Sequence, residues 1–306
     1  MQIAYKHHSN HLILERSADE IRLLGLFPEK AWPREGLQSG RLMQIRLREA
    51  PRAGNQADTA DPVPSQLALV SMFEDNRVHG ELIVIILKDS VTGLLAEVNY
   101  LLCSHSPTIR TWLRVRNDGS TPILLETVHA TILYNLAAGG WSPGLDRTYV
   151  HLWYSGWYGE GQWQKLPLHE VGCFSRWPLH QHSTAAEGGW ASVTVGMLED
   201  VETKTIWYWQ VEPSSSCYWE FGEDTEGKLY VLAGETGSPG GGWNGQLAPG
   251  EALGTMPVTF GCVQGGRREA LTALGSHYQN IAWGLGRGQK NGVSLVEILS
   301  APDLRR

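Results

Sequence analysis

The sequence contains little cysteine, and its four cysteines lie far apart. Cys103, Cys173, Cys217 and Cys262 form no CxxC pair. The chain therefore has neither the dense disulfide framework of a small secreted domain nor the ligand spacing of a zinc ribbon. We expect reduced thiols, most of them buried, in a cytoplasmic protein.

Long hydrophobic runs are also absent. The longest wholly apolar run, LIVIIL, extends only from Leu82 to Leu87, whereas a helix needs about 20 such residues to cross a bilayer. The opening stretch, MQIAYKHHSNHLILERSADE, has no apolar segment of about 7–15 residues and no small-residue cleavage site. The sequence predicts no membrane span and no secretion by a signal peptide.

Positive charge is scarce as well. The 25 basic residues are outnumbered by 32 acidic residues, which gives a net charge of −7. This is the wrong sign for a protein that follows phosphate backbones or binds anionic lipid, so neither nucleic acid nor a membrane is an expected partner. Hydrophobic residues make up 42% of the chain, which favours a folded protein over a disordered one.

What the sequence does contain is a series of short strands separated by turns. Met43, Ile45 and Leu47 alternate with polar residues, as on a half-buried strand. The 35 glycines and 15 prolines indicate many tight connections. Further strands are predicted at 81–88, 94–102, 109–116 and 123–134, as a meander of antiparallel strands, and at 190–198, 205–212, 216–223 and 228–234.

Only one helix is predicted with a clear apolar stripe. In the segment 265–283, one helical face is predicted to carry Ala270, Leu271, Leu274, Tyr278 and Ile281, and Gly284 closes the segment. The fold class is therefore all-β: a large antiparallel β-sandwich with one C-terminal helix. We expect one β domain over residues 1–283 and a linker or tail over 284–306.

The spacing of reactive residues shows no recognisable catalytic motif. No GxSxG sequence is present, and the glycines of SPGGGWNGQ lie between strand-like segments instead of before a helix. A glycosidase needs two carboxylates about 5–5.5 Å or about 6.5–9.5 Å apart. Acidic residues such as Glu160, Glu220 and Glu223 are available, but spacing alone pairs none of them. We therefore name no catalytic residue and expect no cofactor.

His180 and His182 come nearest to a metal signature. Alternate residues on a strand share a face, so two imidazoles there could bind zinc. No third histidine or carboxylate stands at ligand spacing nearby. Histidines that are structural or contact a sugar are the favoured interpretation, and no metal is expected.

The segment 149–172 is rich in large aromatic residues. Trp153, Trp157 and Trp163 could stack on the C–H face of a sugar ring while polar neighbours bind its hydroxyls. The same side chains could instead fill the core or an interdomain seam. The pattern leaves both possibilities open.

Several ordered motifs share a resemblance to one known family. They are Gly156-Trp157 followed by Glu160, KLPLHEVG at 165–172, Ser175-Arg176, His180-Gln181-His182, and QLAPGEALGTMPVTFGCVQGGRREALTALGSHYQ at 246–279. In this order they resemble the N-terminal β-supersandwich domain of bacterial α-galactosidases of glycoside hydrolase family 36. The resemblance extends from about residue 60 to Tyr278 and implies a supersandwich that is galactose-mutarotase-like.

The resemblance also implies where catalysis would occur. In the family, α-galactosides such as melibiose and raffinose are cleaved with retention by two aspartates on a (β/α)₈ barrel that follows the sandwich. Such a barrel needs roughly 250 residues, and only 28 residues follow Tyr278 (306 − 278). The family's loop that reaches a neighbouring subunit's sugar site has its closest counterpart at Asp61, with Val63 in place of the expected arginine.

The leading hypothesis is the accessory domain of an α-galactosidase-like glycoside hydrolase, inactive by itself and homo-oligomeric, with α-galactosides bound through a barrel outside these residues. The candidate sugar contacts are Asp61, Trp153, Trp157, Trp163, His180 and His182. One alternative is a stand-alone carbohydrate-binding module. Another is a metal-dependent enzyme of a β-sandwich or cupin-like type that uses His180 and His182.

Overall fold

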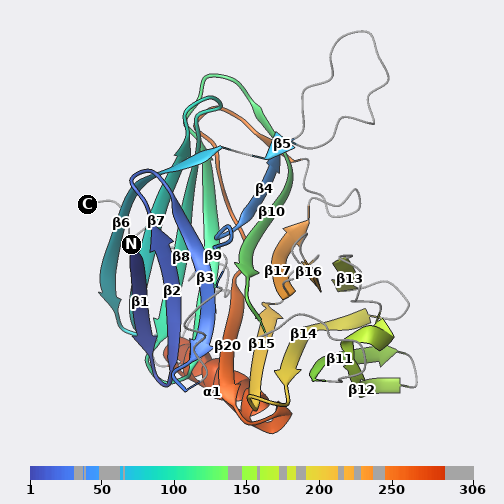
Figure 1. Ribbon diagram of the computed structural model, residues 1–306. Coiled ribbons are helices and arrows are strands. Elements are labelled where there is room, and N and C mark those ends of the chain that lie inside the picture. The colour runs from blue at the N-terminus through green and yellow to red at the C-terminus, as the bar shows by residue number, and fades with distance from the viewer. Residues whose placement is uncertain are drawn as a thin grey trace.

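The chain is described by a computed structural model. It describes residues 1–30, 37, 39–47, 63–64, 66–136, 147–156, 159–171, 178–183, 191–212, 217–223, 229–236 and 245–286. Three antiparallel sheets and one α-helix account for most of this part of the chain (Figure 1). The fold class is therefore the all-β sandwich with a C-terminal helix that the sequence predicts.

The largest sheet has ten strands. Its order is β12-β11-β14-β15-β20-β9-β8-β7-β6, with β19 paired to β9. The strands are β6 (Leu67–Arg77), β7 (Gly80–Asp89), β8 (Leu94–Cys103), β9 (Thr108–Asn117), β11 (Thr148–Gly156), β12 (Gly159–Pro167), β14 (Ala191–Asp200), β15 (Thr205–Val211), β19 (Ala252–Gly254) and β20 (Val258–Gln264). A short 3₁₀ helix, η1 (Leu168–Val171), follows β12.

The second sheet has seven strands and the third has three. The seven-stranded order is β13-β16-β17-β10-β4-β5, with β18 paired to β10. Its strands are β4 (Gln44–Leu47), β5 (Val63–Pro64), β10 (Ile123–Leu133), β13 (Pro178–Ser183), β16 (Cys217–Glu223), β17 (Leu229–Thr236) and β18 (Gln246–Leu247). The small N-terminal sheet has the order β1-β2-β3, with β1 (Gln2–His7), β2 (Asn10–Arg16) and β3 (Ile21–Pro28).

The predicted meander is right for three strands and wrong for the fourth. β7, β8 and β9 are consecutive antiparallel neighbours, but β10 joins the other sheet, where it pairs with β17 and β4. The Asn117 side chain donates to the carbonyls of Thr121 and Leu247 at 2.8 and 2.9 Å, which fixes the chain at this crossover. An Asn-Asp-Gly turn signal marks a reversal but does not distinguish a hairpin from a change of sheet.

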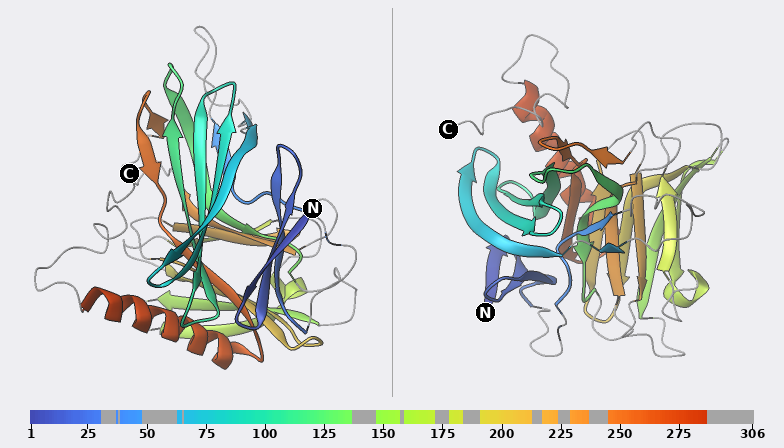
Figure 2. Two further views of the ribbon diagram at one scale, coloured as in Figure 1. Left: turned by 90° about the vertical axis from the view of Figure 1, so that its left-hand side faces the viewer. Right: turned by 90° about the horizontal axis from the view of Figure 1, so that it is seen from above.

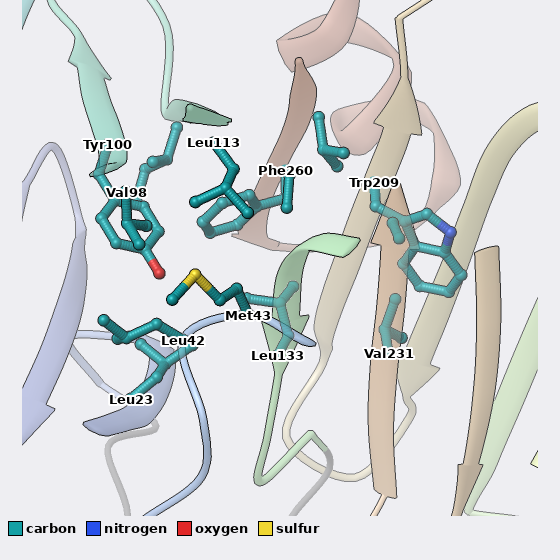
Figure 3. Packing of buried hydrophobic residues seen from close by; sticks show 14 of the residues in the cluster. Leu23, Leu42, Met43, Val98, Tyr100, Leu113, Leu133, Trp209, Val231 and Phe260 are labelled. Carbon is teal, nitrogen blue, oxygen red and sulfur yellow. The ribbon is translucent and has the colours of Figure 1, made fainter. Parts of the chain in front are cut away.

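The main core lies between the sheets and follows the period-two pattern of the strands. Figure 3 shows apolar side chains from all three sheets pointing into one interior; those labelled include Leu23 on β3, Val98 and Tyr100 on β8, Leu133 on β10, Trp209 on β15 and Val231 on β17. A glycine is required at position 196, because a Cβ there would lie 2.3 Å from the indole of Trp209. Cys103 and Cys262 are free, buried thiols, as expected.

The helix α1 (Arg267–Gly286) packs on the outer face of the ten-stranded sheet, against β9, β15 and β20. Figure 2 shows it, in red, running along one side of the molecule beside these strands. Ala270, Ala273 and Leu274 pack against Val195, Met197, Ile206 and Tyr208 in a cluster separate from the main core. Ala270 and Leu274 of the predicted stripe thus lie on the buried face of the helix, but Leu271 is 39% exposed and does not belong to that face. The helix also continues past Gly284, to Gly286. Among the described residues, no helix is long and apolar enough to cross a membrane.

Candidate functional site

A polar and aromatic cluster lies on the outer face of the ten-stranded sheet, beside the start of α1. We call it the His151 cluster, and it consists of His151, Trp153, Trp163, Lys165 and Glu199. Alternation builds it: Val150 and Leu152 point into the main core, so the neighbouring positions 151 and 153 face outward. The register of β11 and β12 then places Trp163 opposite Trp153 and Lys165 opposite His151.

Hydrogen bonds fix the protonation of the imidazole in this cluster. The indole Nε1–H of Trp163 donates to His151 Nδ1 at 3.1 Å, so the ring proton sits on Nε2. That atom donates to Glu199 Oε2 at 2.6 Å, and Lys165 Nζ lies 2.9 Å from the same oxygen. Burial lowers the pKa of His151 although Glu199 favours the charged ring, which agrees with a neutral imidazole.

The carboxylate of Glu199 is the charged centre of the cluster. Burial by itself would raise the pKa of Glu199, but the hydrogen bonds from Lys165 and His151 outweigh it and lower the pKa. Lys165 also lies 4.6 Å from the ring of Tyr149. The neutral imidazole and the ammonium group therefore both bind the carboxylate. Such mutual pairing is typical of a structural network, in which the imidazole orients its neighbours.

The two tryptophans of the cluster contact each other and, in one case, the helix. Their ring centroids are 5.5 Å apart at an interplanar angle of 61°, and both side chains are half-buried. The guanidinium of Arg267, the first residue of α1, lies 5.2 Å from the Trp163 ring, and Trp163 packs against the helix cluster. Trp163 thus joins sheet to helix, while the buried Nε1 of Trp153 has no hydrogen-bond partner among the described residues.

The remaining candidate residues do not join the His151 cluster. His180 and His182 lie on β13, an edge strand of the seven-stranded sheet, in register with Glu220 and Tyr218 of β16. Asp61 and Trp157 lie outside the described residues. Within the described part of the chain, no group of three or more His, Cys, Asp or Glu side chains is placed to hold a metal ion.

The buried carboxylates each belong to a different set of contacts. Asp89 accepts backbone N–H bonds in the β7–β8 turn, and Asp200 does the same after β14 while pairing with Arg147. Glu212 pairs with Arg110, and Glu220 accepts the hydroxyl of Tyr230. Three of these roles are visibly structural, and Glu220 is the one that lies next to predicted site residues.

The helix is held to the sheet by a buried polar network around His277. Its Nδ1 lies 3.0 Å from Thr108 Oγ1 and 3.5 Å from Cys103 Sγ, and its Nε2 lies 3.1 Å from Thr259 Oγ1. Glu212 Oε1 is 4.0 Å from the same Nε2. His277, near the end of the resemblance, is therefore an anchor of α1.

The sequence pattern did not single out three charged residues that form ion pairs or hydrogen bonds in these sites. Glu199 and Arg110 lie on strands with a clear alternation, and Glu212 directly follows such a strand, but their partners come from segments far away in the chain. His151 and Glu199 are 48 positions apart, and Arg110 and Glu212 are 102 apart. The hairpin register of β11 and β12 was the one local signal that could have placed Lys165 beside His151.

Comparison with known proteins gives likeness in structure but not in sequence. No family model matches the sequence, and no curated protein matches it. The solved structures that match include the GH36 alpha-galactosidase AgaB from Geobacillus stearothermophilus, with a TM-score of 0.65 and 12% identity over 87% of this chain and 40% of that chain. The alpha-galactosidase from Lactobacillus brevis matches with a TM-score of 0.67 and 13% identity, over 91% of this chain and 41% of that chain.

The chain has the fold of the N-terminal part of GH36 alpha-galactosidases. The resemblance read from the sequence is thereby confirmed at the level of fold. The galactosidase domain of the alpha-galactosidase-sucrose kinase AgaSK is similar to the same extent, with a TM-score of 0.67 and 12% identity. The chain spans about two fifths of the length of these proteins. A variant of AgaA from Geobacillus stearothermophilus, also similar in fold, is in complex with raffinose.

Proposed function

We propose that this chain is the N-terminal accessory domain of an α-galactosidase-like glycoside hydrolase, and that the groups that cleave the glycosidic bond lie outside these 306 residues. One observation carries the proposal: the fold matches 87–91% of this chain but only 40–41% of the alpha-galactosidases it resembles. The substrates in this proposal are terminal α-galactosides such as melibiose and raffinose.

The charge arrangement of the described residues supports a scaffold role. The carboxylate oxygens of Glu212, Asp200 and Asp89 are already bound by a guanidinium or by backbone N–H groups. A retaining glycosidase instead needs two carboxylates facing one sugar across about 5–5.5 Å. In this proposal residues 1–283 form the accessory domain, residues 284–306 lead toward the catalytic part, and the assembled protein is a cytoplasmic homo-oligomer.

In this proposal the anchored helix α1 sets the direction in which the chain enters the catalytic domain. α1 is tied to β9 and β20 through His277 and to β12 through Trp163, so its direction is fixed by buried contacts. A catalytic domain that follows such a helix starts from a defined position. The His151 cluster, half-buried beside the start of α1, then packs at the seam between domains or along the wall of the sugar cleft.

The test is the coding sequence that follows Arg306 in the genome. The proposal expects a (β/α)₈ domain there, in the same or an adjacent reading frame, and co-purification of its product with this chain when both are expressed together. A downstream region that encodes no such domain, combined with failure of the chain to co-purify with any α-galactosidase activity from its own cell extract, would contradict the proposal.

A stand-alone carbohydrate-binding module is the second candidate, favoured by the half-buried pair Trp153 and Trp163 at the edge of the large sheet. A module of this kind would bind galactosides without cleaving them, and we expect Trp157→Ala or Trp163→Ala to abolish that binding. Calorimetry with galactose, melibiose and raffinose separates the two candidates, because the accessory domain needs no affinity of its own at the His151 cluster.

A further inference from the structure

The strand β6 is one edge of the ten-stranded sheet. It is the last strand in the sheet order, and among the described residues only β7 pairs with it. Figure 2 shows β6, in cyan, at the rim of the molecule. An unpaired edge presents a row of free backbone N–H and C=O groups. The side of β6 that faces away from β7 is therefore available for pairing with another strand.

The register of the β6–β7 hairpin shows which backbone groups are free. A two-residue turn joins the strands, and Arg77 pairs with Gly80 at its closing end. In such a hairpin the closing pair exchanges both backbone hydrogen bonds, the next pair exchanges none, and the alternation continues along the strands. Counting back from Arg77, Met72 and Glu74 direct their N–H and C=O groups away from β7.

Two features limit the segment that can pair. The N–H of Leu69 donates to the carbonyl of Asp19 at 2.7 Å, so the turn between β2 and β3 covers the beginning of β6. The register shifts between Leu69 and Ser71, where a bulge bends the strand. We call residues 71–77 the free edge of β6. Its sequence, SMFEDNR, contains neither lysine nor proline, two residues that commonly protect an edge strand from pairing.

Apolar side chains gather along the free edge. Leu69 and Met72 pack against the main core, whereas Phe73 lies on the opposite face of the strand and is exposed. Val70 and Val78, which flank the free edge, are exposed as well. Burial of such side chains by a partner is favourable.

The charges of the free edge select one register for pairing with a second copy of this chain. An antiparallel contact between two identical strands has a two-fold axis. An axis at Glu74 or at Asp75 would place two carboxylates directly opposite each other, which destabilises a sheet. An axis at Phe73 instead places the two phenyl rings opposite each other. Each Glu74 then faces Met72. Each Asp75 faces Ser71, so no like charges are opposed.

The same axis suits the backbone. It pairs Met72 of one copy with Glu74 of the other, and these are the residues whose N–H and C=O groups point away from β7. The Glu74 side chain is held within its own chain, because the hydroxyl of Tyr5 donates to its Oε1 at 2.8 Å. We propose that two copies of this chain pair antiparallel through the free edge of β6, with the two-fold axis at Phe73. The two ten-stranded sheets then form one continuous sheet.

This inference rests on the proposed function for the expectation of a homo-oligomer, and it deepens that function by assigning the surface through which two copies meet. The contact needs neither a sugar nor a catalytic domain. It can therefore be tested with the purified chain.

Sedimentation equilibrium of the full chain measures the association. Phe73→Asp places two like charges opposite each other at the axis, and we expect it to raise the dimer dissociation constant about tenfold or more. The matched control is Val91→Asp, at an exposed valine in the turn between β7 and β8. This control should dimerise as the unaltered chain does, and circular dichroism checks that both variants are folded.

A cysteine at the axis tests the register. Phe73→Cys places two thiols on directly opposed residues whose Cα atoms are about 4.5 Å apart, a distance that allows a disulfide to form under mild oxidation. Asp75→Cys leaves the two thiols about 13 Å apart along the strands, and this variant should not cross-link. The unaltered chain measures any background from its own cysteines.

The possible outcomes separate the inference from the proposed function. Weaker association of Phe73→Asp, together with cross-linking of Phe73→Cys but not of Asp75→Cys, supports the inference. A chain that is monomeric at all concentrations overturns it, as does a dimer that Phe73→Asp leaves unchanged or cross-linking at position 75 instead of position 73. If Phe73→Asp unfolds, the two cysteine variants decide. None of these results bears on the position of the catalytic groups, which the downstream coding sequence decides.

Discussion

The guanidinium of Arg110 makes a two-point hydrogen bond to the carboxylate of Glu212, with Nε to Oε1 at 2.6 Å and Nη2 to Oε2 at 2.7 Å. Both side chains are at least nine-tenths buried. Thr259 donates to the same Oε1 at 3.1 Å, and His277 of α1 lies within 4.0 Å of it. One ion pair thus connects β9, β20, the end of β15 and the helix.

Removal of one partner of this pair should destabilise the protein strongly. Glu212→Ala leaves a buried guanidinium without its counter-ion, which costs about 3–5 kcal/mol of unfolding free energy. The exposed pair Lys6–Glu29, at 3.1 Å, provides the control, since Glu29→Ala should cost less than about 1 kcal/mol. Urea unfolding of both variants measures the difference, and equal losses would contradict this account of the helix anchor.

Acid should destabilise the protein in part through His7. Burial lowers the pKa of His7 to about 4, and its Nε2 lies 3.0 Å from the carbonyls of Ser106 and Thr108. Between pH 6.5 and about 4 the unfolded chain binds a proton at His7 that the folded chain does not, so stability falls as the pH falls through this window. Unfolding free energies measured from pH 7 to pH 4 should show a shallower decline in His7→Gln. An unchanged slope in that variant would contradict the assignment.

Glu212 should add a second loss of stability at lower pH. Burial tends to raise its pKa, but the hydrogen bonds from Arg110 and the nearby imidazole of His277 lower the pKa to about 2. The stability contributed by the ionised carboxylate is complete above the unfolded pKa of about 4.3 and is lost as the pH falls toward 2. Glu212→Gln should remove this acid-dependent part, which denaturant unfolding between pH 5 and pH 2.5 would detect as a flatter profile than that of the unaltered chain.

The two tryptophans of the His151 cluster should differ in their contribution to stability. Trp163→Phe removes the donor to His151 Nδ1 and contacts with α1, and the lost hydrogen bond alone is worth about 0.5–1.5 kcal/mol. Trp153→Phe removes an indole N–H that has no partner in the described part of the chain, and this change should cost less. Thermal unfolding compares the pair directly. A larger loss for Trp153→Phe would show that the hydrogen-bond assignment is wrong.

Self-association is expected of the isolated chain, because exposed apolar side chains gather around β6. Val70 is 59% exposed, Phe73 47% and Val78 90%, and β6 is an edge strand of the ten-stranded sheet. Exposed apolar edges promote association. Sedimentation velocity should show species larger than a monomer, and Phe73→Lys should reduce them. A monomer at all concentrations, with little binding of a hydrophobic dye, would contradict this expectation.

The sequence predicted the features that depend on local pattern. Alternation placed Met43 and Ile45 inward, where they are 6% and 3% exposed, and the stripe of Ala270 and Leu274 became the buried face of α1. Hairpin partners close in the chain, such as β16 and β17, pair as expected. These features need only side-chain period and turn residues.

Features that depend on contacts between distant segments could not be predicted from the sequence. Nothing near β10 shows that it leaves the meander, because its new partner β17 comes about a hundred residues later. The pairing of His180 with Glu220 likewise required the register of β13 and β16. Glu220 was one of several acidic residues that spacing alone did not pair, and the strand register places its backbone position opposite His180.

The proposed function places the bond-breaking groups outside this chain. The most direct measurement is the hydrolysis of p-nitrophenyl α-galactoside by the purified chain at high protein concentration. The account predicts no release of nitrophenol above the rate in buffer alone. Robust turnover by the pure chain, abolished when one of its own carboxylates is replaced by the amide, as in Glu220→Gln, would contradict it.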